Sequence, residues 1–127
     1  MAKRESLYHA YPDYRVDLEP SSSPVRVTLA GRTLAESTRA LVVRETKHVP
    51  VVYIPTEDVR LELFERTGHR TFCPFKGEAS YWTLRLGDRV EENLVWSYED
   101  PFDEVKGLAG HLAFYPDRVE WEGAPAA

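Results

Sequence analysis

Cys73 and Lys76 carry the most distinctive side-chain chemistry in this sequence. They lie within the segment 71–82, TFCPFKGEASYW, which also contains Pro74 and Gly77. Cys73 is the chain's single cysteine, and a neighbouring ammonium or backbone amide would stabilise its thiolate as a nucleophile. Proline and glycine constrain such a loop. We therefore predict a loop that brings a thiol and an ammonium together, with Cys73 as the candidate catalytic residue.

Each of these two residues also has a plain structural interpretation. Cys73, between Phe72 and Phe75, has the pattern of a small buried apolar residue, which is how most free cysteines behave. Lys76 beside Gly77 can present its ammonium to a phosphate or carboxylate group. Alternatively, Lys76 is a solvated loop lysine. The sequence leaves both alternatives open.

Glu45 and several tyrosines extend the candidate site. Glu45 lies between two apolar runs and would pair with a cation such as Lys76 or Arg60, unless it is a surface acid at a strand end. The predicted ligand-binding residues are Lys76, Glu45, Tyr53, Arg60, Tyr81 and Tyr98.

Strand alternation separates the aromatic residues into those that face the core and those that line a pocket. Neighbours on a strand face opposite ways, so one of Tyr81 and Trp82 belongs to the core while the other lines a pocket. We expect Trp82 and Trp96 in the core. Asp58 is expected to have a structural role, at the first turn of a short helix that Thr56 caps.

A metal site is not predicted. His48, His69, His111 and Cys73 are the candidate ligands, and no two of them have the close spacing of structural zinc sites. No cofactor is expected either.

Composition narrows the class of protein. A chain of 127 residues, 43% of them hydrophobic, suffices for one domain with a core. Its net charge of −5 makes nucleic acid an improbable partner, because phosphate contacts need clustered cations. A lone cysteine forms no internal disulfide, which favours the cytoplasm. We find neither a signal peptide nor a membrane span.

Period-two patterning predicts a mainly β fold, with α+β as the alternative. We expect a compact antiparallel domain of hairpins over 25–122, after an N-terminal arm and linker at 1–24 and before a frayed tail at 123–127. The expected strands are a hairpin at 25–35, then 40–43, 49–54, 59–63, 82–86, 94–98, 112–115 and 119–121. Pro50 indicates an edge strand or a strand entry. Short helices are expected near 55–58 and 101–106.

The two halves resemble each other. Segment 27–36 aligns with 82–91 around a glycine-centred hairpin, and 53–60 aligns with 114–120. This match predicts a pseudo-duplicated half-sheet, although short hairpins also resemble one another by chemistry alone.

Ordered sequence blocks carry a family resemblance that covers most of the chain. They are AES (35–37), RET (44–46), YIP (53–55) with DV (58–59), TFCPFKG (71–77), ASYW (79–82), WSY (96–98) with Pro101, and GHLAFY (110–115). With these blocks the chain resembles the family called domain of unknown function 427, which also carries a nucleotidyltransferase-like label. The resemblance implies a small, mainly β domain of bacterial type with no established activity.

The transferase label conflicts with the spacing of the acids. Metal-dependent nucleotidyl transfer commonly uses carboxylates two residues apart on one strand face. Here the acids are neighbours, at 57–58, 99–100 and 103–104, and neighbours face opposite ways.

The predicted function is binding of a small ligand, anionic or nucleotide-like in one version, in an aromatic-lined pocket. The alternatives are a non-catalytic interaction or self-association module, including a homodimer, and a cysteine-dependent enzyme. Whether the protein is an enzyme stays open.

Overall fold

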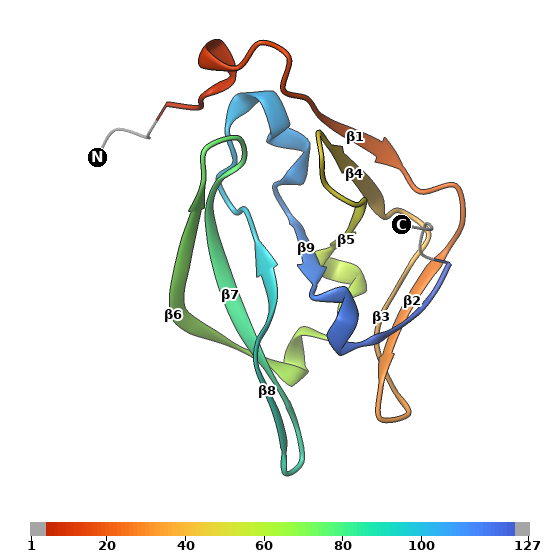
Figure 1. Cartoon of the computed structure of the whole chain (residues 1–127). Helices are drawn as coiled ribbons and strands as arrows, with labels where there is room; N and C mark the ends of the chain where they lie inside the picture. The colour runs from red at the N-terminus through yellow and green to blue at the C-terminus, as the bar shows by residue number, and fades with distance from the viewer. Residues whose placement is uncertain (1–4, 124–127) are drawn as a thin grey trace.

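The computed structural model describes residues 5–123, which form two antiparallel sheets (Figure 1). The larger sheet runs in the order β1 (Val16–Pro20), β4 (Leu41–Glu45), β5 (Val51–Pro55), β9 (His111–Phe114), β8 (Arg89–Ser97), β7 (Gly77–Leu86), β6 (Phe64–Cys73). The smaller sheet runs β10 (Glu120–Glu122), β2 (Val25–Leu29), β3 (Arg32–Ser37). The mainly β prediction is confirmed.

The helical elements within residues 5–123 are all short 3-10 turns. They are η1 (Tyr8–Ala10), η2 (Thr56–Asp58), η3 (Leu61–Leu63), η4 (Asp103–Leu108) and η5 (Pro116–Arg118). Helical turns therefore form at both predicted places, but the α+β alternative does not apply. None of these helices has the length and apolar character needed to span a membrane.

Strand alternation predicted most strands correctly. The β2–β3 hairpin turns at Ala30 and Gly31, whose φ angles of 51° and 77° belong to the left-handed region used by tight hairpins. β5 begins directly after Pro50 and lies between β4 and β9, so Pro50 marks a strand entry. The edge-strand interpretation of this segment is wrong.

Three local predictions differ from the structure. Residues 59–63 alternate in hydrophobicity, but Val59 makes only an isolated bridge to Ala35 and the next residues form η3. Thr56 is the first residue of η2 and makes no side-chain cap; Pro55 precedes it. The range assigned to an N-terminal arm and linker contains strand β1.

The ends of the chain are described only in part. Residues 1–4 of the predicted arm and 124–127 of the predicted frayed tail lie outside the described range. Gly123, the first residue of that tail, accepts a hydrogen bond from Ser23 Oγ at 3.1 Å.

The larger sheet buries both of its faces. Val52 and Ile54 of β5 point into a core shared with the smaller sheet, while Tyr53 between them points into a second core on the opposite face. Val105 and Leu108 of η4 cover this second core. Central strands of the sheet thus carry apolar residues at consecutive positions.

The N-terminal segment, residues 5–15, joins the two sides of the larger sheet. In Figure 1 it passes over the top of the molecule, from the β6–β7 turn across to β1. Leu7 N donates to Pro74 O at 3.0 Å, and Thr46 N donates to Arg15 O at 3.0 Å. The second core is therefore covered at this end by the segment and by η4.

The predicted duplication does not place its hairpins in equivalent positions. The β2–β3 hairpin belongs to the smaller sheet, whereas the β7–β8 hairpin lies in the larger one. Segments 53–60 and 114–120 do share a pattern, because β5 is followed by η2 and β9 by η5.

Phe114 is the residue we expect to matter most to the contact between the sheets. It is 1% exposed and meets Phe64 and Trp121 edge-to-face at 6.1 and 6.2 Å between ring centroids. Phe114→Ala should lower the free energy of unfolding by about 3–5 kcal/mol in chemical denaturation. The exposed Leu61→Ala is the control, and equal losses in both variants would contradict this assignment.

Candidate functional site

A cavity of about 480 Å³ opens on the face of the larger sheet that carries Tyr53. Its walls come from β4, β5, β7 and β8, from the β6–β7 turn and from the N-terminal segment. Six predicted site residues line it together: Cys73, Lys76, Glu45, Tyr53, Tyr81 and Tyr98. The structure thus brings together side chains that are up to 53 positions apart in sequence, counted from Glu45 to Tyr98.

The tight β6–β7 turn positions Cys73 and Lys76. Cys73 pairs with Gly77 across the hairpin, and Lys76 N donates to Cys73 O at 3.2 Å. Gly77 has a φ of +116°, a backbone conformation that residues with a Cβ rarely adopt. Lys76 O accepts from Phe102 N at 3.1 Å, which fixes the turn against the segment before η4.

The Lys76 ammonium is held by a carboxylate inside the cavity. Lys76 is 8% exposed, and its Nζ donates to Oε1 of Glu45, the last residue of β4. The other oxygen of Glu45, Oε2, accepts from the Tyr14 hydroxyl. Nζ also lies 3.7 Å from Cys73 Sγ. The predicted pairing of Glu45 with Lys76 is therefore present, and the solvated interpretation of Lys76 does not hold.

Aromatic rings form the opposite wall. Trp96 Nε1 donates to the Tyr53 hydroxyl at 3.1 Å, and the Trp96 ring also contacts Tyr115, with centroids 4.7 Å apart. Tyr81 lines the cavity, while Trp82 on the opposite face packs against the first core, as alternation predicted. Trp96, which was expected in the core, packs against the second core and also lines the cavity.

Tyr98 is the least satisfied polar residue of the wall. Its side chain lines the cavity, and its hydroxyl, which solvent reaches, has no hydrogen-bond partner among residues 5–123. Burial raises the pKa of Tyr98 and that of Tyr53 above the ordinary tyrosine value. Both hydroxyls therefore stay protonated at neutral pH and can donate hydrogen bonds to a bound molecule.

The N-terminal segment supplies Tyr14, which lines the cavity and was not among the predicted site residues. The Tyr14 ring stacks on Phe75 with centroids 3.8 Å apart, and Tyr8 and Tyr11 meet Phe75 edge-on at 5.1 and 6.0 Å. Tyr8 also donates to Phe75 O at 2.7 Å. The signal in the sequence was the spacing of three residues between these tyrosines, which places their rings around a single partner.

Arg60 and Asp58 lie away from this cavity. Arg60 is exposed, and its backbone N donates to Leu34 O at 2.9 Å beside β3. Asp58 accepts from Ser37 Oγ at 2.6 Å and from Arg39 at 3.3 Å. Asp58 thus lies in the first turn of η2, as predicted, and also ties η2 to β3.

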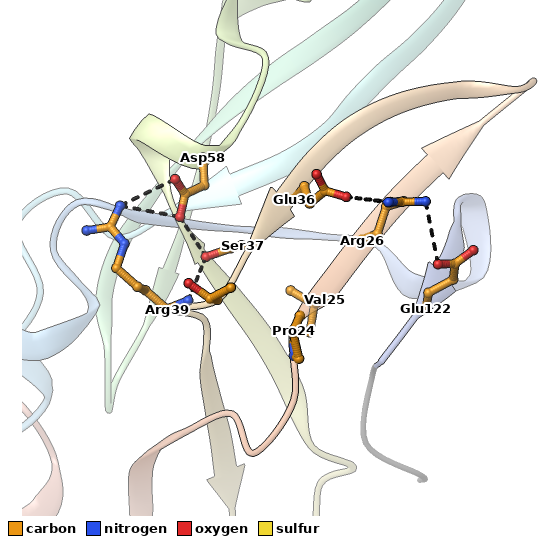
Figure 2. Close-up of a pocket in the computed structure, with 9 residues that line it drawn as sticks. Pro24, Val25, Arg26, Glu36, Ser37, Arg39, Asp58 and Glu122 are labelled. Carbon is orange, nitrogen blue, oxygen red and sulfur yellow. Dashed lines mark hydrogen bonds and ion pairs between the residues drawn. The ribbon is translucent and has the colours of Figure 1, made fainter.

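A second cavity of about 410 Å³ lies near these residues, at the edge of the smaller sheet (Figure 2). Arg26 pairs with Glu36 at 2.6 Å and with Glu122 at 3.8 Å, and Arg39 pairs with Asp58. Figure 2 shows both guanidinium groups turned toward these acids. Because no aromatic ring among residues 5–123 lines this cavity and its charged side chains pair with one another, it is the weaker candidate for a ligand site.

The histidines do not converge. His48 stands at the mouth of the first cavity, 3.9 Å from Glu45 Oε2, whereas the His69 ring lies beside Tyr81 and His111 contacts Ala109 O. Among residues 5–123, no three side chains of His, Cys, Asp or Glu group as metal ligands would.

Comparison with known sequences gives a family but no characterised relative. The sequence model of the family described as "Domain of unknown function (DUF427)" matches residues 17–124. The match includes Glu45, Cys73, Lys76 and the strands around them, and it begins after Tyr14. No curated protein matches the chain.

Breaking the Lys76–Glu45 pair should cost more than removing both charges. The two side chains are 10% and 12% exposed, so Lys76→Met leaves a buried carboxylate unpaired and should destabilise the protein by about 3–5 kcal/mol. The double variant Lys76→Met/Glu45→Leu should be clearly more stable than the sum of the single losses predicts. Additive losses in chemical denaturation would show that the two charges are not coupled.

Proposed function

The chain belongs to the domain of unknown function 427 family, and we propose that it binds a small planar ligand in the aromatic cavity of its larger sheet. The Tyr98 hydroxyl carries the proposal. This hydroxyl lines the cavity without a hydrogen-bond partner among residues 5–123, so it is available to donate to an acceptor atom of a ligand. The cavity volume lies within the usual range for small-molecule sites.

The walls favour a flat ligand. The rings of Phe75, Trp96 and Tyr115 line the cavity from three different segments of the chain. Aromatic faces and edges gain stabilisation from stacked or edge-on contact with another ring, beyond the area that is buried. A planar heterocycle offers both the ring for these contacts and acceptor atoms for Tyr98 and Tyr53.

The charges in the cavity argue against a ligand held mainly by its anionic group. The Lys76 ammonium contacts Glu45, so an incoming phosphate or carboxylate must share that cation with a buried carboxylate. In a nucleotide-like ligand, the base would therefore contribute most of the affinity. The phosphate would lie toward the mouth of the cavity.

The transferase label of the family receives little support from this site. Among the described residues that line the cavity, Glu45 is the only carboxylate. Transfer assisted by two metal ions needs several oxygen ligands around the cations. Binding is thus the better-supported function.

The cytoplasm remains the proposed location, because a fold with one cysteine needs no disulfide.

Filling the cavity should abolish binding. We would titrate the protein with uracil, nicotinamide and uridine 5′-monophosphate, following each by ligand-observed NMR and calorimetry. Val51→Trp places a large ring in the cavity without removing any of its polar groups, and should weaken binding at least about 100-fold. Tyr98→Phe should weaken it about tenfold, by the loss of one hydrogen bond.

The matched control is Val90→Trp, which adds the same ring at an exposed position of β8. It should leave affinity unchanged. Binding of none of the three compounds at millimolar concentration, or equal binding by Val51→Trp and Val90→Trp, would contradict the proposal. Uridine 5′-monophosphate binding far more tightly than uracil would show that the phosphate dominates.

A cysteine-dependent enzyme is the second candidate, favoured by the 3.7 Å contact between Lys76 Nζ and Cys73 Sγ. An ammonium at this distance stabilises a thiolate by a charge-assisted contact. Glu45 holds the ammonium in place from its other side. A substrate with an electrophilic carbon could then be attacked at the cavity wall.

Alkylation tests this second candidate. Iodoacetamide should modify Cys73 of the folded protein faster than free cysteine at pH 7, and Lys76→Met should slow the reaction about tenfold. Lys106→Met, which removes an exposed lysine, should leave the rate unchanged. A Cys73 that reacts more slowly than free cysteine would remove thiolate catalysis from consideration.

Self-association has less support. The edge strand β6 carries Arg66 and Arg70, paired with Glu99 at 2.6 Å and with Glu78 at 3.9 Å. Charged side chains along an edge oppose pairing with a second sheet. A homodimer through this edge is therefore not part of the proposal.

A further inference from the structure

Stacking of a ligand on aromatic rings does not explain why Lys76 is buried beside a carboxylate. Among residues 5–123 it is the buried lysine, whereas Lys47 and Lys106 are exposed. Its Nζ contacts a carboxylate oxygen of Glu45 and lies 6.0 Å from the centre of the Tyr98 ring. The cavity wall thus presents the Lys76 amine, the Glu45 carboxylate as an acceptor for its proton, and the Tyr98 hydroxyl, which has no partner among residues 5–123.

We propose that Lys76 forms an imine with the carbonyl carbon of an aldehyde or ketone bound in this cavity. The inference rests on the proposed function and specifies its ligand class: a planar molecule with a reactive carbonyl group. Lysine amines in water-poor sites are established nucleophiles toward carbonyl compounds.

The groups present account for every proton transfer and every bond change in imine formation. The Lys76 ammonium passes one proton to Glu45, and the neutral nitrogen attacks the carbonyl carbon to form a C–N bond. A second proton moves from that nitrogen to the former carbonyl oxygen, which gives a carbinolamine. Glu45 returns its proton to this hydroxyl, the C–O bond breaks, and water leaves. The product is a protonated imine with the Glu45 carboxylate beside it.

Each neighbour has a defined part in these steps. Glu45 is the proton carrier, because its Oε1 directly contacts Nζ. Tyr98, whose raised pKa keeps its hydroxyl protonated, can donate to the carbonyl oxygen as negative charge develops there. Tyr14 donates to the second oxygen of Glu45 and orients the carboxylate. Tyr14 is thus a positioning residue.

Reductive trapping provides the experiment. The whole protein is incubated with benzaldehyde and sodium cyanoborohydride at pH 7, and peptide mass spectrometry measures the rate at which each lysine gains a benzyl group. We expect Lys76 to be modified at least about tenfold faster than Lys47 and Lys106. An ordinary buried lysine would react more slowly than these exposed ones, so that order of rates would overturn the proposal.

Two variants separate chemistry from structure. Glu45→Gln keeps the shape of the side chain but cannot carry the proton, and should slow modification of Lys76 by about 100-fold while Lys47 and Lys106 are unaffected. If Glu45→Gln fails to fold, Tyr98→Phe replaces it, with an expected loss of about tenfold. An unchanged rate at Lys76 in a folded variant would overturn the mechanism.

The outcome is distinguishable from failure of the binding proposal. If uracil or nicotinamide binds in a way that Val51→Trp prevents, while Lys76 reacts no faster than Lys106, then the cavity is a ligand site without imine chemistry. If Lys76 reacts rapidly and Val51→Trp suppresses this reaction, both proposals are supported.

Discussion

The contact between Lys76 and Glu45 is the interaction on which the site depends. Glu45 ends β4, near one edge of the larger sheet, and Lys76 lies in the turn that joins the two strands at the other edge. The hydrogen-bonded ladder does not join these parts directly. Their charge pair therefore holds the two sides of the sheet around the cavity, and either charge alone would be costly in the same place.

The cavity exists because the larger sheet has two buried faces with different coverings. On one face the smaller sheet packs closely against aliphatic side chains such as Ile54 and Leu112. On the other face, η4 and the N-terminal segment are too short to cover the whole surface, and large rings surround the remaining space. Tyrosine suits this position because its ring packs while its hydroxyl faces the space.

The sequence predicted those parts of the fold whose burial follows a simple period. The β2–β3 hairpin alternates clearly and forms as expected, whereas β7 was predicted only over 82–86 and begins at Gly77, because its first half is buried at consecutive positions. β6 was missed because it is an edge strand whose residues are mostly exposed, so its apolar residues do not alternate. Residues 59–63 alternate but form no ladder, since they connect η2 to β6 and pair only once, through Val59.

Residue type indicated which side chains could line a pocket, but not which of them would meet. The sequence predicted a cationic partner for Glu45 but did not distinguish Lys76 from Arg60. The fold does, because it brings Lys76 to Glu45 and places Arg60 beside Leu34. The spacing of Tyr8, Tyr11 and Tyr14 indicates rings that can pack together, but it does not indicate that the Tyr14 hydroxyl meets Glu45. Both chemistries considered for the site depend on the same nitrogen. Thiolate support at Cys73 needs the ammonium and imine formation needs the free amine, so one Lys76 side chain cannot serve both at the same time.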